Sequence, residues 1–104
     1  MKDRPINIYK LCHEIPKAEV HVHLEGTFEV DYMEILAKKY NTEIPKEALD
    51  LQKQKIFDLN NFFSAYYGAC DLLIDESDFQ GLLERYLKRA SKEGVLYAEI
   101  AIDV

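Results

Sequence analysis

Residues 18–24, with the sequence AEVHVHL, alternate between apolar and polar side chains. This two-residue repeat is typical of a strand that is buried on one face. The apolar face carries Val20, Val22 and Leu24, and the polar face carries Glu19, His21 and His23. Gly26 follows and is expected to end the strand. The pattern predicts a first strand in which one face is apolar and the opposite face is unusually polar.

A second alternating segment, VLYAEIAIDV, covers residues 95–104. Its apolar face is expected to pack on other parts of the fold and consists of Leu96, Ala98, Ile100, Ile102 and Val104. The opposite face holds two carboxylates, Glu99 and Asp103. For these we favour a buried, hydrogen-bonded supporting network over catalysis, because buried carboxylates are usually paired.

Between the strands, residues 30–93 have the apolar spacing of helices, and four helices are expected. The first begins near Val30 and stops at Asn41. Pro45 suits the first turn of a second, short helix at about Lys46–Lys55. Residues 1–17 are expected to be irregular or to form a short helix.

Asp58 is a plausible N-cap for the third helix. Its apolar stripe comprises Leu59, Phe62, Phe63, Tyr66, Cys70 and Leu73. Ser77 and Gln80 have the spacing of a capping box at the start of the fourth helix. Gly94 stands where a glycine commonly terminates a helix.

The order strand, helices, strand predicts an α/β fold. Two strands joined by a long helical crossover are expected to be parallel, and parallel sheets need further strands and helices on both faces. We therefore interpret residues 1–104 as one N-terminal segment of a larger domain: strand 18–24, helical region 30–93 and strand 95–104. A complete domain of 104 residues is the alternative.

Thirteen basic and nineteen acidic residues give a net charge of −6, which counts against nucleic-acid binding and against docking on an anionic membrane. Cys12 and Cys70 are expected to be reduced thiols, since no CxxC or disulfide framework is present. The longest uncharged run, Leu59 to Cys70, is too short to cross a bilayer, and no signal peptide is visible. A cytoplasmic location is expected.

His21 and His23 are the strongest candidates for chemistry. Two positions apart on a strand, their Cβ atoms would be roughly 6–7 Å apart on one face, so both imidazoles could bind one Zn, Fe, Ni or Cu ion. The alternative is two partly exposed histidines in a polar strand. Glu25 follows, and it either contacts substrate or is a solvated loop residue. The pair lies near the end of a strand that leads into a helix, where α/β proteins place their sites.

Three segments in the same order resemble the adenosine and adenine deaminase family of the metal-dependent amidohydrolase superfamily. They are IPKAEVHVHLEGTF, NNFFSAYYGACDLL and DFQGLLERYLKRASKEGVLYAEI. The resemblance covers residues 12–102. It implies that the chain is the first part of a (β/α)8 TIM-type barrel.

The resemblance also implies a catalytic zinc ion with His21 and His23 as two of its ligands. The implied substrate-binding residues are His23, Glu25, Gly26, Leu59, Phe62, Phe63 and Tyr66. Glu25 stands where typical adenosine deaminases have an Asp that contacts ribose, and Glu is similar to the adenine deaminase branch. KEGVLYAEI, in contrast, is similar to the adenosine deaminases. The aromatic stripe would be a lid over the purine pocket, or alternatively plain helix core.

By this resemblance the chain is a segment of a zinc-dependent purine deaminase, which releases ammonia from adenosine or adenine. The catalytic residues and remaining ligands are expected beyond Val104, because a catalytic zinc needs three protein ligands. The alternatives are an amidohydrolase acting on an N6-modified adenine, and a non-catalytic helical interaction module. The isolated segment is expected to self-associate through the edge of its second strand.

Overall fold

The computed structural model describes residues 5–53 and 58–103. In chain order the elements are α1 (Ile8–Glu14), β1 (Lys17–His23), the 3-10 turn η1 (Leu24–Thr27), α2 (Val30–Lys39), α3 (Lys46–Gln52), α4 (Leu59–Cys70), α5 (Glu76–Lys92) and β2 (Val95–Ala101). The fold is mixed α/β, as predicted. Among the described residues between Val30 and Glu93 there are four helices, as the apolar spacing indicates. The expected end of the second helix, at Lys55, lies outside the described residues.

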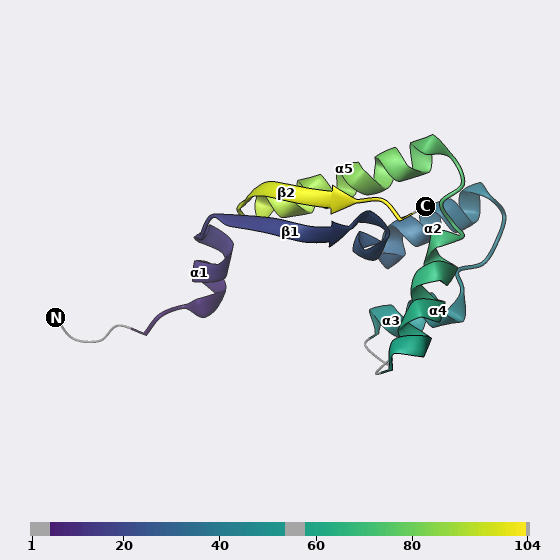
Figure 1. The fold of residues 1–104 in the computed structure, drawn as a ribbon, viewed down its shortest axis with the longest axis horizontal. Helices are drawn as coiled ribbons and strands as arrows, with labels where there is room; N and C mark the ends of the chain where they lie inside the picture. Colours follow the sequence, from purple (N-terminus) through teal and green to yellow (C-terminus); the bar gives the residue numbers. More distant parts are fainter. Residues whose placement is uncertain (1–4, 54–57, 104) are drawn as a thin grey trace.

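The two strands pair in parallel, which confirms the predicted crossover. In Figure 1, α5 runs along one face of the sheet, and α2, α3 and α4 gather beyond the ends toward which both strands point. His23 lies opposite Ala101 in the register. The polar end of β1, the turn η1 and the residues after β2 are therefore brought to one end of the sheet.

Helix α2 ends through the backbone conformation of Asn41, which has a φ of 50°. The N–H of Thr42 donates to the carbonyl of Ala37 at 2.8 Å, and the N–H of Asn41 donates to that of Lys38 at 3.3 Å. These two bonds form a Schellman motif, which satisfies carbonyls left free at the helix end. The predicted stop at Asn41 is confirmed.

Gly94 ends α5 with a φ of +81°. A Cβ at this position would meet the backbone oxygens of His13 and Ile15 at 3.0 and 3.1 Å. Both the positive φ and the close backbone approach favour glycine. The carbonyl of Gly94 then accepts a hydrogen bond from Lys17 N–H at 3.0 Å, which joins the start of β1 to the end of α5.

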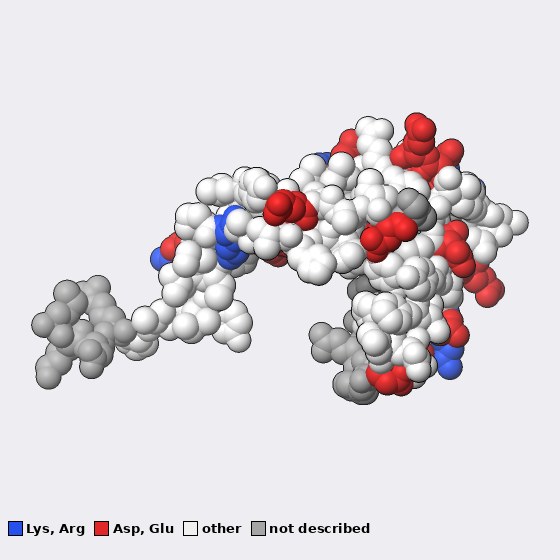
Figure 2. Space-filling model, viewed as in Figure 1, with Lys and Arg blue, Asp and Glu red and all other residues white. Residues whose placement is uncertain are grey.

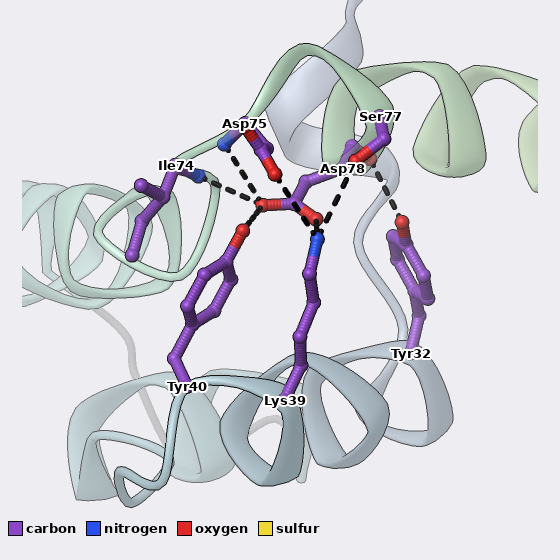
Figure 3. A network of polar contacts seen from close by, with 7 residues as sticks. All are labelled: Tyr32, Lys39, Tyr40, Ile74, Asp75, Ser77 and Asp78. Atoms are coloured by element: carbon purple, nitrogen blue, oxygen red, sulfur yellow. Dashed lines mark hydrogen bonds and ion pairs between the residues drawn. The ribbon is translucent and has the colours of Figure 1, made fainter.

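The start of α5 differs from the expectation of a capping box at Ser77 and Gln80. The N-cap is Asp75, and Asp78 is its partner three residues later. Oδ2 of Asp78 accepts from the N–H groups of Ile74 and Asp75 at 3.1 and 3.0 Å (Figure 3). Asp78 prevails because it also has partners on α2, which a local sequence pattern does not reveal.

Lys39 and Tyr40, at the end of α2, reach across to the same carboxylate. The Nζ of Lys39 lies 2.7 Å from Oδ1, and the hydroxyl of Tyr40 donates to Oδ2 at 2.5 Å (Figure 3). Burial alone would raise the pKa of Asp78, but these donors and the two backbone N–H groups hold it well below its usual range. The contact fixes the end of α2 against the start of α5.

The main core lies between α2, α5, η1 and the α4–α5 connection. Its buried members include Leu24, Phe28, Met33, Leu36, Leu72 and Leu82. A smaller cluster between α5 and the sheet contains Val22, Tyr86 and Ala90, with Ala98 and Ile100 packed beside it. Together these clusters hold η1 and the ends of the strands in place.

The apolar faces of the two strands are covered less completely than the pattern predicts. Val20, Leu96 and Ile102 are 64%, 80% and 57% exposed. The α5 helix packs over Val22 and Ile100 and leaves these other side chains uncovered. Val104, predicted on the same face, lies outside the described residues.

Within residues 5–53 and 58–103, no helix combines the length and apolarity needed to cross a membrane. On the face shown in Figure 2, acidic side chains are spread over the helices at the strand ends, while basic side chains are sparse. This distribution agrees with the net charge of −6.

Candidate metal and purine site

His21 and His23 project from the same face of β1. This confirms the prediction, made from their two-residue spacing, that both imidazoles share one face. Their Nε2 atoms are 3.0 Å apart, and their ring centroids are separated by 4.9 Å. Both side chains are exposed. Two ring nitrogens therefore converge on one point at the C-terminal end of the strand.

Asp103 lies behind His23. Its two carboxylate oxygens are 3.0 and 2.9 Å from Nδ1 of the imidazole. A carboxylate only accepts hydrogen bonds, so Nδ1 carries a proton, and in the neutral imidazole Nε2 then has the free lone pair. This is the arrangement in which a metal-binding histidine is held by an outer carboxylate.

Glu25, in η1, is 2% exposed and holds the chain beyond β2. Its Oε1 and Oε2 accept from the backbone N–H of Asp103 at 3.1 and 3.3 Å. The hydroxyl of Tyr66, on α4, lies 3.2 Å from Oε2 of Glu25 and 2.6 Å from Oδ2 of Asp103. Three separate elements thus meet at one polar cluster.

The electrostatics of this cluster follow from its contacts. Burial, the hydrogen bond to Asp103 and the charge of Glu25 raise the pKa of Tyr66 above its usual range. The hydrogen bonds from Tyr66 and His23 lower the pKa of Asp103. Tyr66 is therefore a neutral donor and Asp103 an anionic acceptor at neutral pH. Burial, with the nearby charges of Glu25 and Asp103, raises the pKa of the Cys70 thiol to about 11.

An open cavity of about 700 Å³ lies in front of the two histidines. Its lining includes His21, His23, Gly26, Thr27, Phe62, Phe63, Tyr66, Tyr67 and Asp103. The rings of Phe62 and Tyr66 are stacked at 6.1 Å with an interplanar angle of 27°. A cavity lined by imidazole and carboxylate groups together with aromatic rings suits a flat, polar, aromatic ligand.

The donor set fits part of a zinc site. Zn–N bonds are about 2.0–2.1 Å long, so two nitrogens bound to one ion lie at most about 4.2 Å apart. The Nε2 separation of 3.0 Å satisfies this limit. In the described part of the chain, no group of three or more His, Cys, Asp or Glu side chains is placed to hold a metal ion. Two imidazoles are therefore a partial ligand set.

Most of the predicted substrate-binding residues meet at the cavity. His23, Gly26, Phe62, Phe63 and Tyr66 line it. Glu25 lies behind its wall, on a smaller cavity of about 70 Å³. Leu59 is 65% exposed and lies outside the lining of both cavities.

The stripe on α4 lines the cavity more than it forms the core. Phe62 and Phe63 are 37% and 43% exposed, and α4 buries Ala65 and Ala69. Helical spacing identified the aromatic face but not what it contacts.

Two cavity residues carry a weaker sequence signal. Tyr67 adjoins the predicted stripe, and Asp103 was predicted only as part of a supporting network. The contact of Asp103 with His23 agrees with that network, although its side chain is 35% exposed. For Glu99, the other carboxylate of the pair, the prediction of a buried network is wrong: its side chain is exposed, because it extends from β2 at a point that no other described element covers.

A family model described as adenosine deaminase matches residues 16–104. The chain belongs to the adenosine deaminase family. This assignment covers β1, the four helices after it and β2, and so includes both histidines, Glu25 and the aromatic face of α4.

The relatives of this family member include the adenine deaminases of Acinetobacter baylyi and Saccharomyces cerevisiae. The first is 34% identical over 94% of this chain and 30% of its own length, and the second is 38% identical over 90% and 29%. A crystal structure of adenine deaminase from Arthrobacter aurescens superposes with a TM-score of 0.74 at 37% identity, over 85% of this chain and 28% of that one. The chain spans less than a third of the length of these relatives.

Proposed function

We propose that this chain supplies one side of the active site of a zinc-dependent purine deaminase and forms the first part of its (β/α)8 barrel. The observation that carries the proposal is the pair of Nε2 atoms 3.0 Å apart, one of them on an imidazole whose Nδ1 faces a carboxylate. That arrangement brings two imidazole nitrogens to one point, where they could bind one metal ion. Membership of the adenosine deaminase family supports the same reading.

In this proposal, His21 and His23 hold the ion, and Asp103 keeps His23 in the tautomer that binds metal. A bound zinc ion would supply a nucleophile at neutral pH by lowering the pKa of a coordinated water to about 7. The remaining ligands and the proton donor come from outside this chain, since catalytic zinc sites use three protein ligands.

Adenine is the substrate that we favour. The relatives named above are adenine deaminases, and the cavity presents the stacked rings of Phe62 and Tyr66 to a flat base. Glu25 supports the same choice, because its side chain is one methylene longer than the Asp that the resemblance associates with ribose. Aromatic stacking would orient the base with its edge toward the histidines.

The proposal is tested on the full-length protein as its gene encodes it. Formation of the purine product is measured with each substrate: hypoxanthine from adenine and from N6-methyladenine, and inosine from adenosine. The leaving amine is ammonia for adenine and adenosine and methylamine for N6-methyladenine. Zinc content is measured by elemental analysis. We expect about one zinc per protein and the highest kcat/KM with adenine. Activity confined to N6-methyladenine would overturn the choice of substrate, and a protein without zinc would overturn the proposed chemistry.

Substitution of the ligands gives the second test. His21→Ala and His23→Ala should each remove most of the zinc and the activity, because each deletes a proposed ligand. His13→Ala is the matched control: His13 is an exposed histidine on α1, away from the cavity. Equal zinc content in all three variants would contradict the assignment of the ligands.

A further inference from the structure

We infer that Asp103 is a positioning residue for His23, and that Tyr66 and Glu25 in turn hold Asp103, so that a metal ligand on β1 is tied to the cavity-lining helix α4. The inference rests on the proposed zinc site. Asp103 contacts the proposed metal ligand His23 and would not contact the ion itself. Tyr66 and Glu25 contact Asp103.

Asp103 is held by contacts from other elements and not by the sheet. The β2 strand ends at Ala101, so Asp103 lies beyond the ladder of backbone hydrogen bonds. Its N–H donates to the buried carboxylate of Glu25, and its side chain accepts from Tyr66. Within the described residues, Glu25 thus fixes the backbone of Asp103, while Tyr66 and His23 fix its carboxylate.

Both carboxylate oxygens of Asp103 lie within 3.0 Å of Nδ1 of His23, so the carboxylate contacts the ring nitrogen through both of its oxygens. An anionic acceptor holds the Nδ1 proton more strongly than a neutral amide would. This fixes the ring plane and leaves Nε2 free to bind an ion. Without it, His23 could rotate or adopt the tautomer that cannot bind metal through Nε2.

Tyr66 connects this arrangement to the aromatic wall of the cavity. Its ring stacks on Phe62, and its hydroxyl is 2.6 Å from Asp103. A shift of α4 would therefore lengthen the hydroxyl–carboxylate contact and loosen the support of His23. The position of the cavity wall and the affinity for the ion are coupled through one hydroxyl group.

The test uses the full-length protein and measures zinc affinity by competition with a chromophoric chelator. Asp103→Asn should weaken zinc binding about 10- to 100-fold, the usual effect of losing an outer partner of a histidine ligand. Tyr66→Phe keeps the ring and removes one hydrogen bond, so a loss of about fivefold is expected. The absorption spectrum of the cobalt-substituted protein should change in both variants, which a purely structural role would not produce.

Two matched controls separate the roles. Glu99→Gln removes an exposed carboxylate from β2, and Tyr97→Phe removes an exposed tyrosine hydroxyl from the same strand. Both variants should bind zinc within about twofold of the unmodified protein, since, among the described residues, neither side chain is hydrogen-bonded to His21, to His23 or to Asp103. Thermal unfolding of the zinc-free variants reports whether each one folds.

The outcomes distinguish this inference from the proposed function. If the unmodified protein binds no zinc, the proposed site fails and this inference fails with it. If it binds zinc, and Tyr66→Phe and Asp103→Asn bind it equally well, the positioning role is overturned while the zinc site stands. If Asp103→Asn does not fold, Tyr66→Phe alone decides, with Tyr97→Phe as its control.

Discussion

The carboxylate of Asp78 lies 2.7 Å from the Nζ of Lys39 and joins the first turn of α5 to the last turn of α2. The side chain of Asp78 is 2% exposed, whereas that of Lys39 is 41% exposed. The buried carboxylate of Asp78 has four donors: the ammonium group of Lys39, the hydroxyl of Tyr40 and two backbone N–H groups. Its hydrogen-bonding capacity is therefore satisfied. Removing the carboxylate leaves those donors without their common partner.

Asp78→Ala is therefore expected to destabilise the folded chain by about 2–4 kcal/mol, because it breaks a buried charged network. Thermal or urea unfolding of the full-length protein measures the loss. Glu34→Ala is the matched control, since Glu34 is an exposed carboxylate on α2, and it should cost less than about 0.5 kcal/mol. Equal destabilisation by both substitutions would contradict a special role for Asp78.

The same network predicts the response to acid. The folded-state pKa of Asp78 is held below its unfolded value of about 3.9. Its contribution to stability is therefore fully present above that unfolded value and is lost as the pH falls through the lower folded value. Three ionisable groups lie close to this carboxylate: Lys39, Tyr40 and Asp75. The negative charge of Asp75 does not reverse the lowering of the pKa of Asp78.

The measurement compares unfolding of the unmodified protein and of Asp78→Asn between pH 6 and pH 2. The difference in stability should be constant at the upper end and should shrink below about pH 4, where the unmodified protein begins to lose this contribution. A difference that stays constant over the whole range would show that the charge of Asp78 does not matter.

Gly81, on α5, lies against the side chain of Tyr32 on α2. A Cβ added there would lie 2.2 Å from the hydroxyl oxygen of Tyr32 and 2.9 Å from its Cζ atom. That hydroxyl donates to the carbonyl of Asp78 at 2.9 Å, and Tyr32 is 8% exposed, so the ring has little room to move. Gly81→Ala should destabilise the fold by about 1–3 kcal/mol, although alanine favours helix by about 1 kcal/mol.

Gly68→Ala is the matched control on α4, because among the described residues a Cβ there meets Pro45 alone, at an ordinary 3.4 Å. It should be neutral or stabilising. In a Tyr32→Phe background, Gly81→Ala should cost less, because the nearest oxygen is gone. Equal costs in both backgrounds would exclude the overlap with Tyr32 as the cause.

The sequence predicted the elements that depend on local patterns. The alternation around His21 and His23 placed both rings on one face, and Asn41 and Gly94 marked two helix ends through their tolerance of positive φ. The contact between His23 and Asp103 could not be predicted in detail. It depends on the register between β1 and β2, and the two residues are 80 positions apart in the chain.

Burial was the less predictable property. Leu96 has the same alternation as Ile100, yet it is 80% exposed, because α5 packs over only part of the sheet. A local pattern indicates which side chains share a face but not how far a distant helix covers that face. The aromatic stripe of α4 shows the same limit, since the rings of Phe62 and Phe63 border a cavity.

The exposed apolar side chains of the sheet predict self-association of the isolated 104-residue chain. Val20, Leu96 and Ile102 are more than half exposed. Within the described residues, β1 and β2 pair only with each other, so each has an outer edge able to pair with another strand. Light scattering should give an apparent mass that rises with protein concentration.

Leu96→Lys should lower that apparent mass by adding a charge at the exposed edge. Ile35→Lys is the control, because Ile35 is 50% exposed on α2, away from the sheet. A chain that remains monomeric at all concentrations, or equal effects of both substitutions, would contradict association through the sheet.

Glu25 provides the last prediction, which concerns the choice between a base and a nucleoside. Its carboxylate reaches the N–H of Asp103 and the hydroxyl of Tyr66 only because the side chain is long enough to span the gap from η1. Glu25→Asp shortens that reach by one methylene and opens space beside the cavity. In the full-length protein, the ratio of kcat/KM for adenosine to that for adenine should rise. Glu25→Gln keeps the length and should leave the ratio unchanged, so equal ratios in all three proteins would remove Glu25 as the determinant of substrate choice.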